Sequence, residues 1–267
     1  MVTIANQKGG VGKTTTLVSL GAELASRARV LLLDLDPQAN ATSSVGVDPR
    51  SVERSSYDLL VGQADVNSCI VPTGVANLDL IPATSALAGA QIEIVGMTDR
   101  ERLLDRALAP LRAEDAEPAY EVVLIDTPPS LGLLTLNALA ASEAVIVPVQ
   151  CEYLALEGLS QLLETIQMTR ESYHLDLTVL GIILTMFDPR TNLSEQVADE
   201  VRKHFPEITF RAAIPRSVRL SEAPSYGQPI QVYDRTSRGA QAYGLCAMEL
   251  MVRLSRLSGR RAEAVGG

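Results

Sequence analysis

The sequence predicts a single α/β domain: a mostly parallel, twisted β-sheet with helices on both faces. Short apolar, β-branched runs alternate along the chain with longer helical stretches. Because these runs are apolar throughout, they are typical of strands that are covered on both faces of a parallel sheet. Hydrophobic residues make up 46% of the 267-residue chain, enough for a sizeable core, and no repeat or composition break marks a second domain.

Each element rests on a local pattern. The expected strands, in chain order, are Val2–Ala5, Val30–Leu33, Leu78–Ile81, Val122–Ile125, Ala144–Val149, Val179–Leu184 and Ile208–Ile214. The expected helices are Lys13–Arg27, Thr98–Leu111, Leu131–Ala141, Glu152–Tyr173, Leu193–Phe205 and Gly239 to about Leu257. Thr98 and Glu101 form a capping-box pattern at the start of the second helix. We expect the domain to span 1–257 and the segment 258–267 to be a flexible tail.

Composition excludes several classes of protein. No apolar run approaches the ~18 residues of a membrane span, and no basic segment with a cleavage site indicates a secretory signal. The three cysteines are scattered, which suits a reducing cytoplasm better than a disulfide framework or a zinc site. Two histidines, no tryptophan and 4% aromatics argue against a histidine metal centre and a base-stacking platform.

Charge is unevenly distributed along the chain. The net charge is −9, yet the part from residue 187 onward holds 12 basic and 9 acidic residues, against 11 and 23 before it. This basic C-terminal third could consist of solvated arginines or form a surface for a polyanion. On charge alone, the solvated arginines are the favoured interpretation.

A glycine-rich turn follows the first expected strand. Residues 6–16 read NQKGGVGKTTT and hold two of the three lysines of the chain. Glycines let backbone N–H groups point inward at an anion, and the following helix N-terminus adds its dipole. Lys13 can reach the β- and γ-phosphates of a nucleotide, and the Thr14 hydroxyl can ligate Mg²⁺. Gln7 stands where the usual phosphate-loop pattern has its first glycine, and Lys8 is an additional lysine.

Acidic residues end two further strands. Asp34 and Asp36 close the second, where alternation would place both carboxylates on one side of an extended segment. Burying them costs free energy unless Mg²⁺, a nucleotide or a polarised water compensates. Asp126 follows four apolar residues, the Walker-B pattern in which the carboxylate reaches Mg²⁺ directly or through water. The carboxyl ends of parallel strands lie at one edge of the sheet, so a nucleotide site is expected there.

Six segments together carry a resemblance to a known family. They are KGGVGKT at 8–14, DLDPQ at 34–38, DTPPS at 126–130, PVQCEY at 148–153 and the pair TMFDPRTN at 185–192 and IPRSVRLSEAP at 214–224. The first resembles the deviant Walker A motif. Over nearly the whole chain, from Val2 to about Leu257, the sequence is similar to the chromosomal ParA/Soj-type partition ATPases without an N-terminal DNA-binding extension.

The resemblance implies a deviant P-loop fold and a sandwich homodimer closed around two ATP molecules. Lys8 would reach the partner's phosphates, and Lys13 would act within its own subunit. Asp36 would position the attacking water, with Mg²⁺ near Thr14, Asp36 and Asp126. The nucleotide contacts implied are Lys8, Gly9, Gly10, Val11, Gly12, Lys13, Thr14, Thr15, Pro215 and Ser217. The last position is often Asn in the family.

The resemblance also implies partners. The ATP-bound dimer would bind double-stranded DNA without sequence preference, and a ParB-type centromere-binding protein would stimulate hydrolysis. The family's DNA-contacting arginines map onto Arg190 and Arg219, and Arg216 extends the patch, as do Arg235 and Arg238. We therefore expect a cytoplasmic, nucleoid-associated protein without stable membrane association. The alternatives are a membrane-cycling ATPase of the division-site type and a nitrogenase-reductase-like ATPase, for which the cysteine spacing is unsuitable.

We also expect the Lys8 ammonium to be buried beside the glycines. No acidic residue lies close to it in sequence. Such an ammonium is costly unless an anion meets it. A phosphate bound to the partner subunit would supply that anion.

Overall fold

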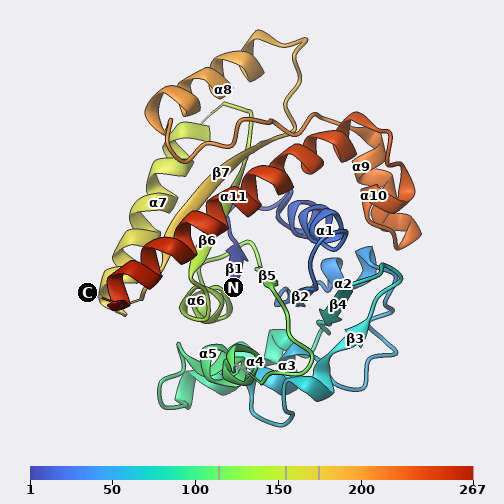
Figure 1. Ribbon diagram of the computed structural model, residues 1–267, viewed down its shortest axis with the longest axis vertical. Helices are drawn as coiled ribbons and strands as arrows, with labels where there is room; N and C mark the ends of the chain where they lie inside the picture. Colours follow the sequence, from blue (N-terminus) through green and yellow to red (C-terminus); the bar gives the residue numbers. More distant parts are fainter. Residues whose placement is uncertain (114, 154, 174, 267) are drawn as a thin grey trace.

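The computed structural model describes residues 1–113, 115–153, 155–173 and 175–266, with only the backbone described for 260–266. In this part of the chain, seven strands form one sheet in the order β3-β4-β2-β5-β1-β6-β7 (Figure 1). All neighbouring pairs are parallel except β3 and β4, which are antiparallel at one edge. The strands are β1 (Val2–Ile4), β2 (Val30–Asp34), β3 (Val71–Pro72), β4 (Leu78–Ile81), β5 (Val122–Asp126), β6 (Ala144–Gln150) and β7 (Thr178–Thr185). The predicted α/β fold class is confirmed.

The strand predicted at Ile208–Ile214 is wrong, and the two-residue edge strand β3 was not predicted. The predicted segment runs beside β7 but pairs with it only through isolated bridges, such as Ile182 with Thr209. The Arg253 guanidinium donates to the Leu180 and Ile208 carbonyls at 2.7 and 3.0 Å, and the Ile208 carbonyl also accepts the Ile182 N–H at 2.8 Å. A half-buried arginine of α11 thus binds carbonyls of both segments, which a continuous ladder of hydrogen bonds does not join.

Helices cover both faces of the sheet (Figure 1). They are α1 (Lys13–Leu24), α2 (Asn40–Ser44), α3 (Ser56–Leu60), α4 (Leu87–Glu93), α5 (Leu103–Ala107), α6 (Leu133–Ala140), α7 (Ala155–Ser172), α8 (Asn192–His204), α9 (Val218–Glu222), α10 (Ile230–Tyr233) and α11 (Arg238–Gly266). No described helix is long and apolar enough to span a bilayer. α11 continues past the predicted end at Leu257, and the flexibility of 258–267 stays a prediction.

The capping box predicted at Thr98 is wrong. Asp99 has a φ of 50°, so the chain turns there, and α5 begins only at Leu103. The left-handed backbone at Asp99 is incompatible with a helix that starts at Thr98. A capping box is found instead at the N-terminus of α3, where the N-cap residue Ser55 pairs with Asp58.

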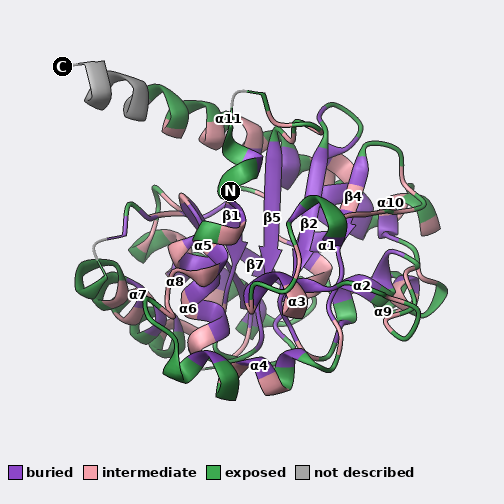
Figure 2. Cartoon of the chain, turned by 90° about the horizontal axis from the view of Figure 1, so that it is seen from below, coloured by how far each residue is buried: buried purple, intermediate pink, exposed green. Residues whose placement is uncertain are grey.

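The core has two sides, as strands buried on both faces require. On β2, Val30 and Leu32 pack on the side of α1 and α11, whereas Leu31 and Leu33 pack on the side of α3 to α6. On β6, Val145, Val147 and Val149 lie on the face opposite α1 and α11, where they pack beneath α7 and α8. Figure 2 shows the strands as the buried centre, with exposed residues on the outer faces of the helices.

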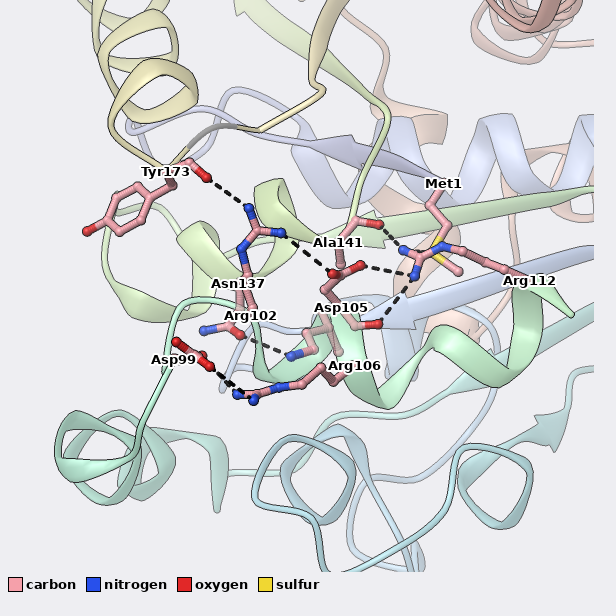
Figure 3. A network of polar contacts seen from close by, with 10 residues as sticks. Met1, Asp99, Arg102, Asp105, Arg106, Arg112, Asn137, Ala141 and Tyr173 are labelled. Carbon is pink, nitrogen blue, oxygen red and sulfur yellow. Dashed lines mark hydrogen bonds and ion pairs between the residues drawn. The ribbon is translucent and has the colours of Figure 1, made fainter. Parts of the chain in front are cut away.

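The irregular α5 segment is fastened to α6 and the N-terminus by polar side chains (Figure 3). Buried Asn137 of α6 accepts the Leu104 N–H at 3.0 Å and donates to the Arg100 and Leu133 carbonyls at 2.7 and 2.9 Å. Arg112 donates to the Ala141 carbonyl at 2.7 Å. The bond from the Leu104 N–H satisfies a donor in the first turn of α5, which has no side-chain cap at its N-terminus.

Asn137→Ala should lower the free energy of unfolding by about 2–4 kcal/mol, because it leaves buried backbone groups without partners. Asn67→Ala is the matched control, since Asn67 is exposed and its side chain makes no hydrogen bond within the described structure. Urea unfolding of both variants checks this prediction. Equal free energies of unfolding for the two variants would show that the hydrogen bonds of Asn137 (Figure 3) do not stabilise the fold.

Candidate nucleotide-binding site

The three polar strand ends that the sequence predicted lie together. Asp126 at the end of β5 is in register with Ile4 of β1 and with Asp34 of β2. β1 leads directly into the glycine-rich turn, and α1 begins at Lys13. The turn, Asp36 and Asp126 therefore meet at the carboxyl edge of the sheet, as expected for a ligand site in a parallel sheet.

The glycine-rich turn is held open by its backbone geometry. Gly10 and Gly12 have φ values of 75° and 89°, which favour glycine at both positions. Asn6 fixes the start of the turn, donating to the Pro148 carbonyl at 2.7 Å and accepting the Lys8 N–H at 3.0 Å. Thr185, at the end of β7, donates to the Val11 carbonyl at 2.8 Å. The turn is thus fixed by hydrogen bonds to two other strands, β6 and β7.

Lys13 is a buried cation at this turn. Its side chain is 7% exposed, and its Nζ donates to the Lys8 carbonyl at 3.2 Å. Burial lowers the pKa of Lys13, and the charges of Asp126 and Asp36 only partly oppose this effect. An anion bound in the turn would stabilise the ammonium.

Asp126 is a buried acid beside the same turn. Its Oδ2 accepts the Thr14 hydroxyl at 2.6 Å, whereas its buried Oδ1 has no hydrogen-bond partner within the described residues. Burial and then the neighbouring Asp34 raise the pKa of Asp126, and the Thr14 hydrogen bond opposes them. An unpartnered carboxylate oxygen next to a threonine hydroxyl is the donor set that a hard divalent cation prefers.

Asp34 and Asp36 do not face the same way, which corrects the expectation from alternation. Asp34 is fully buried and accepts the Thr42 N–H and hydroxyl, each at 2.8 Å, and the Asp36 N–H at 3.1 Å. β2 ends at Asp34, so the extended alternation does not continue to Asp36. Asp34 therefore anchors α2, and Asp36 alone faces the cavity.

A cavity of about 780 Å³ lies over this edge of the sheet. Its lining includes most of the predicted nucleotide contacts, namely Gly9, Gly10, Gly12, Lys13, Thr14, Thr15, Pro215 and Ser217, together with Asp36, the residue predicted to position the water. Val11 is buried, and neither Val11 nor Lys8 belongs to this lining. Phe187 joins the far wall to β7, because its N–H donates to the Ile214 carbonyl and its carbonyl accepts the Arg216 N–H, both at 2.9 Å. The segment 214–217 is thereby placed beside the glycine-rich turn.

Lys8 is not buried, which corrects the sequence-based expectation. Its side chain is 58% exposed and forms an ion pair with Glu152, which follows β6. The sequence does not reveal this acidic partner, because Glu152 lies 144 positions from Lys8 in the chain. Lys8 therefore has a carboxylate partner within its own chain and is largely exposed.

The arginines predicted to contact DNA are exposed. Arg190 pairs with Asp188, and Arg219 pairs with Glu222 at 3.2 Å and Asp234 at 3.7 Å. Arg216, which lines the cavity, makes no ion pair within the described residues, and the same holds for Arg235 and Arg238. We refer to Arg190, Arg216 and Arg219 together as the arginine ridge.

Sequence reasoning missed three contributors to the site. They are Thr185, which fixes the glycine-rich turn, Thr42, which binds Asp34, and Glu152, which pairs with Lys8. Thr185 could have been found, because it is a polar residue at the carboxyl end of an apolar strand. Thr42 and Glu152 act through contacts that only the folded chain creates.

Comparison with known proteins agrees with this geometry. Residues 1–179 match the AAA domain family. The chain is 55% identical over 244 residues to the sporulation initiation inhibitor protein Soj of Bacillus subtilis, covering 91% of this chain and 94% of that protein. It is 48% identical over 262 residues to the chromosome partitioning protein ParA of Myxococcus xanthus, covering 98% and 91% of the two chains.

Similar solved structures include one described as cobyrinic acid a,c-diamide synthase from Mycobacterium smegmatis with a bound ATP analogue and magnesium. It is 39% identical with a TM-score of 0.81, covering 95% of each chain. The fold is thus that of nucleotide-binding P-loop proteins. With the phosphate-loop geometry, the buried Lys13 and Asp126 and these relatives taken together, the chain belongs to the ParA/Soj family of chromosome-partitioning ATPases.

Proposed function

We propose that this protein hydrolyses ATP to control a DNA-binding homodimer in chromosome or plasmid segregation. The observation that carries the proposal is that Lys13, Thr14 and Asp36 line one cavity behind a left-handed glycine turn, with Asp126 bound to the Thr14 hydroxyl. Such an arrangement suits a polyphosphate with a divalent cation. Its membership of a family of partition ATPases supports the biological role.

The residues present fit ATP and Mg²⁺. The buried Lys13 ammonium calls for an anion, and the buried, unpartnered Oδ1 of Asp126 calls for a cation. Thr14 and Asp126 would hold Mg²⁺, with Asp36 nearby. When bound, the cation would neutralise charge on the phosphates. Pro215 and Ser217 line the opposite wall, where the base of the nucleotide would lie.

Each residue would then have a separate task. The N–H groups of the glycine-rich turn and the Lys13 ammonium would bind the β- and γ-phosphates and stabilise the charge that develops on them. Asp36 is 7% exposed, and its Oδ1 accepts the Gln38 N–H at 2.9 Å, which fixes the carboxylate. A fixed carboxylate at the cavity wall would orient the attacking water.

Dimerisation would complete the site and create the DNA surface. Lys8 would leave Glu152 and reach the phosphates in the partner subunit. Two copies of the arginine ridge would then face one DNA duplex and contact phosphates without reading bases. A ParB-type protein would stimulate hydrolysis and release the dimer from the nucleoid.

Co-sedimentation tests this function against the membrane-cycling alternative. In ATP, the protein should pellet with random-sequence duplex DNA and remain in the supernatant with anionic liposomes. α11 supports this expectation, because it buries Tyr243, Cys246 and Leu250 against the domain. Pelleting with liposomes but not with DNA would replace the proposed function by the membrane-cycling one.

Arg190→Glu and, separately, Arg219→Glu should abolish DNA binding at physiological salt while ATP-dependent dimerisation persists. Each change removes one phosphate contact per protomer and adds repulsion. The wild-type salt dependence should correspond to several phosphates, each contributing about −0.9 to the log–log slope. Fluorescence anisotropy with a labelled duplex measures this, with exposed Arg27→Glu as the control. Unchanged affinity in both ridge variants would place the DNA interface elsewhere.

A further inference from the structure

Two turns of the same sequence, Asp-Pro-Arg, have the same internal hydrogen bonds. They span Asp48–Arg50 and Asp188–Arg190. In each, the aspartate accepts the arginine backbone N–H, the Nε and the Nη2. The distances are 3.0, 3.0 and 3.0 Å in the first turn and 3.1, 2.9 and 2.7 Å in the second. The aspartate thus binds the guanidinium fork with both oxygens, as a phosphate would.

The surroundings of the two turns differ. The Asp188 N–H donates to Ser194 at the start of α8 at 3.2 Å, and the Asp188 side chain is only 17% exposed, whereas Arg190 is 83% exposed. The hydrogen bonds from Arg190 and, to a smaller extent, the charge of Arg216 lower the pKa of Asp188 to about 2. Asp188 is therefore a fixed anion among the arginines of the ridge. In the other turn, by contrast, Arg50 is the only arginine that lowers the pKa of Asp48.

The same neutralisation occurs at the other end of the ridge. Arg219 contacts Glu222 and Asp234, and its guanidinium lies 6.0 Å from the centre of the Tyr233 ring. Two of the three ridge arginines are thus already bound to carboxylates of their own chain. A DNA phosphate must either displace a carboxylate from the N–H groups it holds or bind the remaining N–H groups of the same guanidinium, and in both cases a carboxylate stays close to the phosphate and repels it.

Breaking such a pair is not prohibitive. Exposed ion pairs contribute little to stability, and Arg190 is mostly exposed. The guanidinium would exchange one bidentate acceptor for another, so the carboxylate reduces affinity for DNA without blocking it. One protomer's ridge would consequently bind weakly, and the combined contacts of two protomers would be needed for stable binding.

We propose that Asp188 competes with DNA phosphate for Arg190 and thereby keeps the DNA affinity of the protein low until two protomers act together. This inference rests on the proposed DNA-binding function. It identifies Asp188 as a positioning residue that acts through Arg190, and it accounts for an arginine ridge that is locally neutralised in the free protein.

Asp188→Asn tests the proposal. Asparagine keeps a side-chain oxygen for the Arg190 N–H and removes the competing charge. Asp48→Asn is the matched control, because it makes the same change in the same kind of turn away from the ridge. On the ATP-bound dimer at low salt, Asp188→Asn should bind a random-sequence duplex about 2- to 30-fold more tightly, the range for two exposed ion pairs per dimer. Asp48→Asn should bind like the wild type.

Repeating the comparison in an Arg190→Ala background separates competition from a general charge effect. The gain from Asp188→Asn should shrink there, because the arginine that it frees is missing. An undiminished gain in that background, or equal effects of Asp188→Asn and Asp48→Asn, would overturn the inference alone. Failure of the wild-type protein to bind DNA in ATP would instead overturn the proposed function.

Discussion

Asp36→Ala should bind ATP and dimerise but hydrolyse ATP about 10²- to 10⁴-fold more slowly than the wild type, the usual contribution of a positioned acid–base group. The prediction follows from the geometry at the end of β2. Of the two aspartates near the end of β2, only Asp36 lines the cavity. The Gln38 N–H donates to its carboxylate and fixes it. Removing it should leave the phosphate contacts of the turn and Lys13 in place.

The ATP-bound Asp36→Ala dimer should therefore accumulate and be visible by size-exclusion chromatography. Hydrolysis is measured as phosphate release. Asp58→Asn is a control for a hydrogen-bonded aspartate outside the site, because Asp58 serves the Ser55 capping box. Normal hydrolysis by Asp36→Ala would show that another group orients the water.

Lys8→Ala should bind ATP yet lose about 10³- to 10⁵-fold in hydrolysis rate, the range for a cationic group supplied in trans. Lys13 already lies in the phosphate-binding turn of its own subunit. Lys8 is exposed and points away to Glu152, so its ammonium is available to a second protomer. DNA binding should fall together with hydrolysis, because both depend on the closed dimer.

Mixing Lys8→Ala and Asp36→Ala subunits tests whether Lys8 acts across the dimer. In a heterodimer, the Lys8→Ala subunit keeps its own Asp36 and receives Lys8 from its partner, so one of the two pockets should regain activity. The control replaces the Lys8→Ala subunit by the doubly substituted one, which should restore nothing. Absence of recovery in demonstrated heterodimers would place Lys8 in its own subunit's site.

Much of the site could be predicted because its residues act through local chain geometry. The glycines at positions 10 and 12, Lys13 and Thr14 occupy adjacent positions at a strand–helix junction. Asp126 follows from an apolar run that ends in an acid. The register of parallel strands then brings these local features to one edge, where the glycines, Lys13 and Thr14 line the cavity and Asp126 accepts the Thr14 hydroxyl.

The remaining features depend on contacts between distant parts of the chain. No residue near Lys8 in sequence indicates that it pairs with Glu152. Likewise, no residue near Asp34 in sequence indicates that its carboxylate binds Thr42 and does not face the cavity. The segment 208–214 has the apolar pattern of a strand, yet it forms only an isolated bridge with β7, and the half-buried Arg253 from α11 binds carbonyls of both segments. Tertiary contacts therefore overrode local preference at these positions.

The affinity of the protein for random-sequence duplex DNA in ATP, in ADP and without nucleotide tests the central claim most directly. The account predicts salt-sensitive binding in ATP that rises with the fraction of dimer, and binding at least about 10-fold weaker in the other two states. Equal affinity in all three states would contradict the claim that ATP controls a DNA-binding dimer.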